Sequence, residues 1–221
     1  MTKMLFLNKK WLPALLVVSL IYGGCLSVQP TMRDFMTEND FQLCLAQVTL
    51  DFLQSPWAEH AMKDGRKAGT LLLNPPLHNG VLRIRTGKGG KELRSFSVDG
   101  EFTRPMVHLL QDPVACQKFW ASLRADYPTV WHDLCVQRGM DETTWQPPVL
   151  EKPLFAKTGY QPDASCTHSL TVTFSQDTNR VDANHSIEQF RFHVQLLEIE
   201  SGHVEVMAMG TAQHEWKRKV W

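Results

Sequence analysis

Cysteine and histidine are the residue types in this chain best suited to chemistry, because both can bind metals and a thiol can also form a disulfide or carry a lipid. The chain has five cysteines and nine histidines. No two cysteines have the C-x-x-C spacing, so neither a thioredoxin-like redox site nor a zinc ribbon is indicated. The best metal-ligand candidates lie on or near the strands expected in the C-terminal third: His185, His193, His203 and His214. Whether these side chains meet depends on the strand register, which the sequence does not give. We therefore expect histidines that lie on the surface and no metal site.

Known catalytic motifs are absent from the sequence. It contains no HExxH, GxSxG or SxxK pattern, no EF-hand loop and no GxGxxG after an expected strand. The commonest hydrolase and nucleotide-binding classes are therefore not indicated, and we expect no catalytic residue and no cofactor. The open alternative is an enzyme that assembles dispersed Asp, Glu and His side chains.

The first 24 residues have the pattern of an export signal. Three lysines precede an apolar run, residues 11–22, which two glycines and Cys25 follow. A twelve-residue run is too short to cross a bilayer, which takes ~20 residues. The sequence therefore predicts a signal peptide over residues 1–24 that is removed on export.

The end of this segment resembles the lipobox of bacterial lipoproteins, with Gly23 and Gly24 before Cys25. The resemblance implies cleavage before Cys25 and fatty acylation, with palmitate among the acyl chains, of this new N-terminal residue. Leu26, rather than Asp, follows the cysteine, which is compatible with sorting to the periplasmic face of the outer membrane. Plain secretion with cleavage nearby is the alternative.

Charge and cysteine number bear on the exported chain. Removing the leader takes away three lysines and no acidic residue, which leaves 20 basic and 23 acidic side chains, a net charge of −3. This balance provides no strong field for nucleic acid, so membrane attachment would come from acyl chains. Beyond Cys25 the cysteines are Cys44, Cys116, Cys135 and Cys166. They suit two disulfides or, equally, buried thiols that act as small apolar side chains.

The segment after the leader divides into a tether and a body. Residues 25–36 lack periodicity and are interpreted as a short tether, and residues 37–221 as a single globular domain. Thr37 and Asp40 form a capping-box pattern, followed by an apolar stripe that predicts an amphipathic helix ending near Ser55. A short helix is expected over residues 57–64.

The middle of the chain mixes strand and helix signals. The apolar run 70–73 predicts a buried strand, and residues 81–98 predict a hairpin whose five basic residues suit a solvated edge. Two helices are expected in tandem, over residues 103–111 and then from Asp112 to about residue 125. Five prolines interrupt residues 127–162, where we expect one short element around Trp131 within a long connection.

The C-terminal third alternates apolar and polar residues with a period of two. Residues 170–174, 190–196 and 204–210 predict three strands, and Ser201-Gly202 predicts a turn that closes a C-terminal β-hairpin. The fold class is therefore α+β, a mixed or antiparallel sheet with helices packed on it. At the very end, Trp216, Arg218 and Trp221 form an aromatic and basic tail that suits a partner contact.

The order of elements resembles the outer-membrane lipoproteins of the Lpo type, which activate penicillin-binding proteins. The similarity rests on the acylated Cys25, on residues 69–74 with Asn79 behind them, and on the closing hairpin, whose last strand carries a glycine within 204–210. It implies that the protein binds another envelope protein and regulates it. A penicillin-binding protein is the partner that the resemblance suggests. A lipoprotein component of a secretion or conjugation apparatus, or an anchored periplasmic hydrolase, is the alternative.

Overall fold

The computed structural model describes residues 36–63, 69–74, 81–86, 92–162, 165–182 and 185–217. The predicted signal peptide, Cys25, Arg218 and Trp221 lie outside these ranges. The stretch from Phe35 to Trp221 forms one compact unit, described below. Met36, the last residue of the predicted tether, is already buried in a short strand of this unit.

Five α-helices and one π-helical turn lie in the described residues. In chain order they are α2 (Glu38–Leu53), α3 (Pro56–Lys63), the π turn η2 (Asp99–Thr103), α4 (Arg104–Gln111), α5 (Pro113–Asp126) and α6 (Pro128–Arg138). Proline stands in the first turn of α4, α5 and α6, where its missing N–H costs nothing. Gly139 ends α6 with φ of +64°, a left-handed conformation that suits glycine.

Strong N-terminal caps start two of the helices. The Thr37 hydroxyl accepts the Asp40 N–H at 3.1 Å, while the Asp40 carboxylate accepts the Thr37 N–H at 3.0 Å. The Asp112 carboxylate likewise accepts the backbone N–H groups of Val114 and Ala115, at 2.9 and 3.1 Å. These contacts confirm the predicted starts of α2 and α5, because both caps depend on residues close in sequence.

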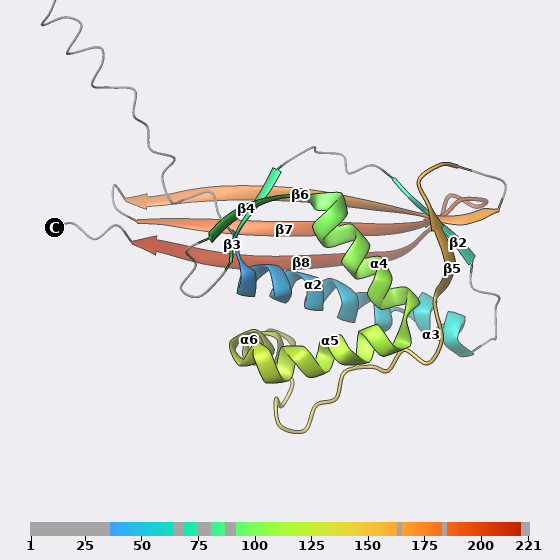
Figure 1. Ribbon diagram of the computed structural model, residues 1–221, viewed down its shortest axis with the longest axis horizontal. Coiled ribbons are helices and arrows are strands. Elements are labelled where there is room, and N and C mark those ends of the chain that lie inside the picture. The colour runs from blue at the N-terminus through green and yellow to red at the C-terminus, as the bar shows by residue number, and fades with distance from the viewer. Residues whose placement is uncertain are drawn as a thin grey trace, which may run out of the picture. The chain divides into compact units, whose positions relative to one another are not determined.

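Eight strands form two sheets in the described part of the chain (Figure 1). They are β1 (Met36–Thr37), β2 (Gly69–Leu73), β3 (Val81–Thr86), β4 (Glu92–Ser97), β5 (Phe155–Gly159), β6 (Cys166–Asp182), β7 (His185–Glu198) and β8 (Val204–Lys217). The three-stranded sheet has the order β1-β3-β4, with β3 and β4 antiparallel as predicted. The five-stranded sheet has the order β5-β2-β6-β7-β8, with β2 parallel to both of its neighbours and the last three strands antiparallel. The α+β class and the mixed sheet are thereby confirmed.

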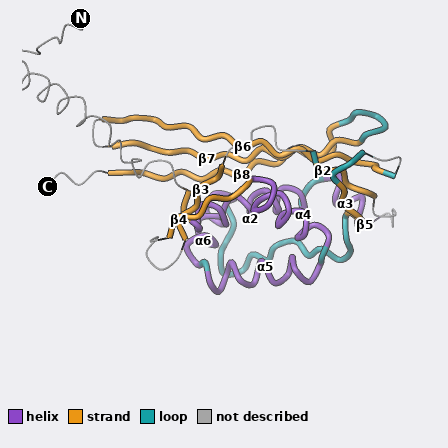
Figure 2. The backbone as a smooth tube through the Cα atoms, turned by 45° about the horizontal axis from the view of Figure 1, so that its top comes forward, coloured by secondary structure: helices purple, strands orange, loops and turns teal. Residues whose placement is uncertain are grey.

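The large sheet is covered by helices on one face. Figure 2 shows β6, β7 and β8 running side by side with the helices on one side of them. On β7, the alternate residues from Phe190 to Leu196 are buried toward the helices, while His193 and Gln195 on the other face are exposed. The ring of Phe192 stacks on Phe102 and meets Phe41 edge to face. Alternation in the sequence therefore separated the core face from the solvent face correctly.

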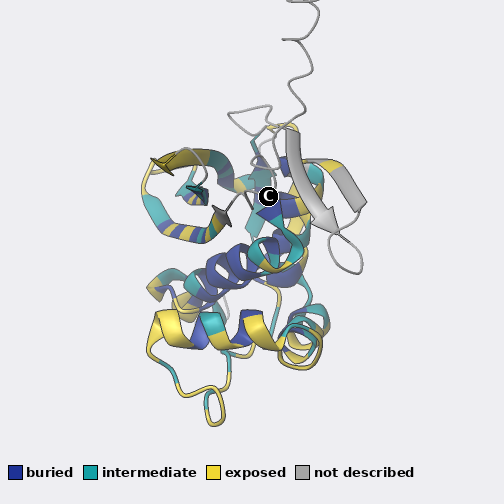
Figure 3. Cartoon of the chain, turned by 90° about the vertical axis from the view of Figure 1, so that its left-hand side faces the viewer, coloured by how far each residue is buried: buried dark blue, intermediate teal, exposed yellow. Residues whose placement is uncertain are grey.

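Helix α2 lies between the sheet and the other helices, and Figure 3 shows it as the buried middle layer. It contacts β8 and β7 on one side and α4 and α6 on others. Eleven of its sixteen residues are buried. The expectation of a single apolar stripe was wrong, because the helix is enclosed by partners on several sides and buries residues such as Leu43, Ala46 and Leu50 as well.

The contact between α2 and the edge strand β8 depends on a glycine. A Cβ placed on Gly210 would lie 2.5 Å from the Cys44 carbonyl oxygen and 2.9 Å from its Cα. The close approach brings side chains of α2 to the open edge of β8, where Gln47 accepts the Thr211 N–H at 2.6 Å and Asp51 accepts the Met209 N–H at 3.3 Å. An edge strand exposes unpaired backbone groups, and α2 satisfies two of them here.

Residues 127–162 hold more structure than the sequence indicated. The short element expected around Trp131 is the full helix α6, and the connection after it ends in strand β5, which the sequence analysis missed. Pro128 starts a helix instead of breaking one, because the first turn of a helix tolerates proline. Strand β5 carries exposed residues at its centre, Ala156 to Thr158, and owes its place to pairing with β2.

Candidate functional site

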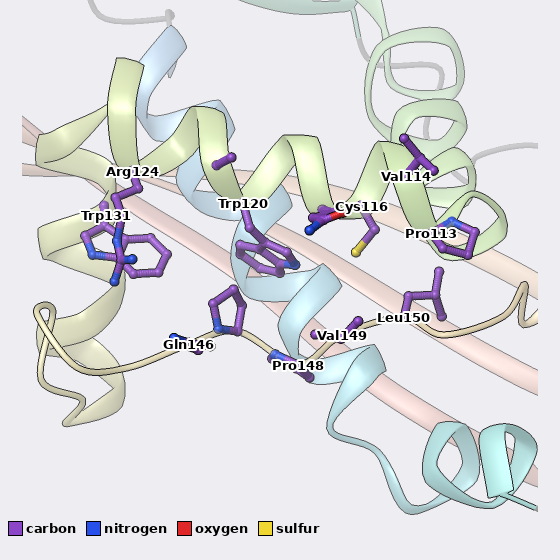
Figure 4. Close-up of a pocket in the computed structure, with 13 residues that line it drawn as sticks. Pro113, Val114, Cys116, Trp120, Arg124, Trp131, Gln146, Pro148, Val149 and Leu150 are labelled. Atoms are coloured by element: carbon purple, nitrogen blue, oxygen red, sulfur yellow. The ribbon is translucent and has the colours of Figure 1, made fainter.

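A groove lies between α5 and the segment after α6 (Figure 4). Its volume is about 320 Å³. We call residues 146–149, which form its far wall, the strap. The remaining lining comes from α5, from Trp131 of α6 and from Leu150, and the complete set is Pro113, Val114, Cys116, Gln117, Trp120, Ala121, Arg124, Trp131, Gln146, Pro147, Pro148, Val149 and Leu150.

The strap is anchored at both ends. On one side, the carbonyl of Trp145 accepts from Arg124 at 3.1 Å, and the carbonyl of Glu142 accepts from the Trp131 indole at 3.1 Å. On the other side, Leu150 is buried in the core. Between these anchors, the two consecutive prolines of the strap have no N–H groups, and no hydrogen bond from the strap to other described residues is formed. The strap therefore stands off α5 and leaves the groove open.

Aromatic rings build the floor of the groove. Trp120 and Trp131 both pack against Trp145, with ring centroids 6.4 and 5.0 Å apart respectively. The Trp120 ring projects from α5 toward the strap (Figure 4). At the mouth, Val114 is 57% and Val149 71% exposed, so apolar surface continues out of the groove. Such surface is suited to contact with an apolar partner.

Few polar groups face the groove. The Arg124 guanidinium lies over the Trp131 ring, 4.8 Å from its centroid. Burial raises the pKa of the Cys116 thiol, and the neighbouring Trp120 indole lowers it by less, so this thiol stays protonated and unreactive at neutral pH. The lining of the groove contains no carboxylate and no histidine. The groove is thus equipped for binding, with no acid and base side by side in its wall.

The four cysteines of the body lie on four different elements, namely α2, α5, α6 and the start of β6. None of these four described cysteines forms a disulfide in the structure. The side chains of Cys44, Cys116 and Cys135 are buried. Burial raises the pKa of each of these three thiols. This arrangement corresponds to the alternative of buried apolar thiols, and pairing on export stays a prediction.

The four candidate histidines do not converge in the described part of the chain. His185 contacts Glu215 at 2.6 Å and His214 lies 3.7 Å from Asp40. His193 sits opposite Met209 in the sheet, whereas His203 precedes β8, so the register separates these two. Within the described residues, no three potential ligands gather as a metal site.

The predicted aromatic tail is only partly described. The backbone of Trp216 belongs to β8, where it pairs with Ser186, so the sheet extends further toward the C-terminus than the sequence indicated. Arg218 and Trp221 lie outside the described residues, and their contact role stays a prediction. The groove was not predicted, because no pattern in the sequence brings Trp120, Trp131 and residues 146–149 together. The high tryptophan content and Pro147-Pro148 were the available signals.

Comparison with known proteins adds no relative. No known family matches the chain, and no curated protein is similar to it. Among the described helices, none is long and apolar enough to cross a membrane. The geometry of the groove and the sequence features are therefore the basis for assigning a role.

Proposed function

We propose that this protein is a lipid-anchored envelope protein that acts by binding another envelope protein. Acyl chains on Cys25 would hold it at the periplasmic face of the outer membrane, and the groove beside α5 would receive an apolar peptide segment of the partner. A penicillin-binding protein is the partner that the resemblance to Lpo-type activators implies. Regulation of peptidoglycan synthesis would be the outcome.

The groove is the observation that carries this proposal. It combines exposed apolar residues at its mouth, Val114 and Val149, with a tryptophan floor. Tryptophan and arginine are typical of the few residues that supply most of the binding energy in protein interfaces, and Trp120, Trp131 and Arg124 line this groove. An anchored hydrolase would need converging acid and base groups, and the lining of the groove favours binding instead.

A photo-crosslinking residue at position 149 in the full-length chain tests the groove directly. The matched control is position 136, on the outer face of α6, where Val136 is 64% exposed but does not line the groove. We expect one envelope protein to be crosslinked from position 149 and not from position 136. With that protein purified, Val114→Asp should weaken binding about tenfold, since it places a charge in apolar surface.

The identity of the crosslinked protein separates the alternatives. Crosslinking of a penicillin-binding protein would support the activator role. Crosslinking of a subunit of a secretion or conjugation apparatus would instead support a role as a component of that apparatus. Equal crosslinking from both positions would contradict a role for the groove. The anchor has its own test, since mass spectrometry of the mature chain should find a lipid-modified Cys25 and no leader, and an unmodified thiol would refute that part.

A further inference from the structure

The indole N–H of Trp120 is a buried donor without a hydrogen-bond acceptor in the described structure. The residue is 6% exposed and its ring forms part of the groove wall. The indole faces the Cys116 sulfur of α5 closely enough to lower the pKa of that thiol, but sulfur is a weak acceptor and the contact falls short of hydrogen-bond geometry. A carbonyl oxygen is a stronger acceptor than a thiol sulfur, so a ligand carbonyl at this position would satisfy the indole better than Cys116 does.

Arg124 is a cation held in a fixed position at the Trp131 end of the groove. Its Nη2 atom donates to the carbonyls of Glu142 and Trp145, at 3.2 and 3.1 Å, and its plane stacks on Trp131. An arginine has five N–H donors, so Nη1 and Nε keep theirs for a ligand. No acidic side chain of the described residues forms an ion pair with Arg124. A guanidinium fixed in this way is suited to receive a carboxylate.

The strap favours a side-chain carboxylate over the carboxylate at a chain end. Chain ends are usually captured by successive backbone N–H groups. Pro147 and Pro148 remove two such donors from the wall that faces α5. The remaining donors belong to the side chains of Trp120 and Arg124, whose Cα atoms lie one helical turn, or roughly 6 Å, apart along α5.

We infer that the groove recognises an extended apolar peptide segment carrying an Asp or Glu side chain, whose carboxylate pairs with Arg124 and whose main-chain carbonyl accepts the Trp120 indole N–H. This inference rests on the proposed function and specifies the chemistry of the partner segment. Apolar side chains of the segment would contact Val114 and Val149. The strap, which is anchored only at its ends, would move aside to admit the carbonyl.

The probe is the capped peptide N-acetyl-Leu-Ala-Leu-Glu-amide, titrated into the detergent-solubilised full chain labelled with ¹⁵N at the tryptophan indoles. Trp120→Phe identifies the Trp120 signal. We expect this signal to move downfield on binding, as a newly formed hydrogen bond requires. The peptide with Gln in place of Glu should bind at least fivefold more weakly. Arg124→Gln should remove the difference between the two peptides while the Gln peptide still binds, which distinguishes loss of the ion pair from loss of the Trp145 contact that anchors the strap.

A third peptide, ending in Gln with a free chain-terminal carboxylate, tests the other source of the anion. Tighter binding of this peptide than of the Glu peptide would overturn the side-chain assignment. Equal binding of the Glu and Gln peptides, or an unmoved Trp120 signal on saturation, would overturn the inference altogether. The proposed function would survive these results if position 149 still crosslinks an envelope protein, so the two failures are distinguishable.

Discussion

Helices α2 and α5 are similar in length, with 16 and 14 residues, but they use their surfaces differently. Eleven residues of α2 are buried, against three of α5. Helix α2 lies between the sheet and the outer helices, whereas α5 belongs to the outer layer and turns one face to the groove. The apolar surface of α2 is buried and stabilises the fold, whereas part of the apolar surface of α5 stays accessible to a partner.

The polar groups of the two helices differ in what they contact. Gln47 and Asp51 of α2 satisfy backbone donors of β8, and Asp51 also pairs with Arg138 of α6 at 2.7 Å. On α5, the Arg124 guanidinium instead donates to carbonyls beside the strap, at Glu142 and Trp145. Each helix also holds one buried side-chain atom without a hydrogen-bond partner, the Thr49 hydroxyl on α2 and the Trp120 indole nitrogen on α5.

Truncating an apolar side chain in each region should give the largest difference. Leu50→Ala removes a fully buried side chain of α2 and should lower the free energy of unfolding by about 2–5 kcal/mol. Val114→Ala, on α5, should change it by less than about 0.5 kcal/mol, because the side chain is 57% exposed. Urea denaturation followed by circular dichroism measures both. Similar losses from the two variants would break the comparison.

Gly210→Ala tests the closeness of the α2 and β8 contact. The added methyl group would collide with backbone atoms of Cys44, and we expect a loss of about 1–3 kcal/mol in the free energy of unfolding. Gly159→Ala is the matched control, since the nearest atom to its new Cβ would be 3.9 Å away. A stable Gly210→Ala variant would mean that α2 lies further from the sheet than described.

The cap of α5 should have a moderate effect. Asp112→Ala leaves the N–H groups of Val114 and Ala115 without their acceptor and should cost about 1 kcal/mol of unfolding free energy. Asp112→Asn retains a capping oxygen and should recover most of the loss. Because the cap is next to Pro113 in the groove wall, crosslinking from position 149 should also fall in the alanine variant.

Tyr127 links the two regions and gives the smallest predicted effect. Its hydroxyl donates to the Glu38 carboxylate at 2.7 Å, and this bond, followed by burial, raises the pKa of Tyr127 to about 12. A raised folded-state pKa stabilises the fold below the unfolded value of about 10, and this contribution disappears as pH rises through 12. Tyr127→Phe should therefore cost about 0.5–1 kcal/mol at pH 8.

The measurement for Tyr127 is urea denaturation at several pH values. The difference in unfolding free energy between the wild type and Tyr127→Phe should shrink between pH 10 and 12. A constant difference over this range would show that the tyrosine hydrogen bond does not contribute to the fold.

Local signals in the sequence predicted most of the secondary structure. The Thr37 and Asp40 cap, the Asp112 and Pro113 start and the turn at Gly202 each depend on residues within a few positions of one another. The alternation in the last three strands likewise gave their buried faces. The exceptions were α6 and β5, where the prolines looked like breaks and the strand was defined by its partner β2.

The sequence by itself determined the α+β class and the closing hairpin, because both follow from short-range composition and periodicity; export and the Cys25 anchor stay predictions. Only the tertiary structure decided that α2 is enclosed, that Gly210 meets Cys44, and that two tryptophans and a proline strap line a groove. These features join residues separated by long stretches of chain. Their contacts depend on how helices and strands pack, which no local pattern specifies.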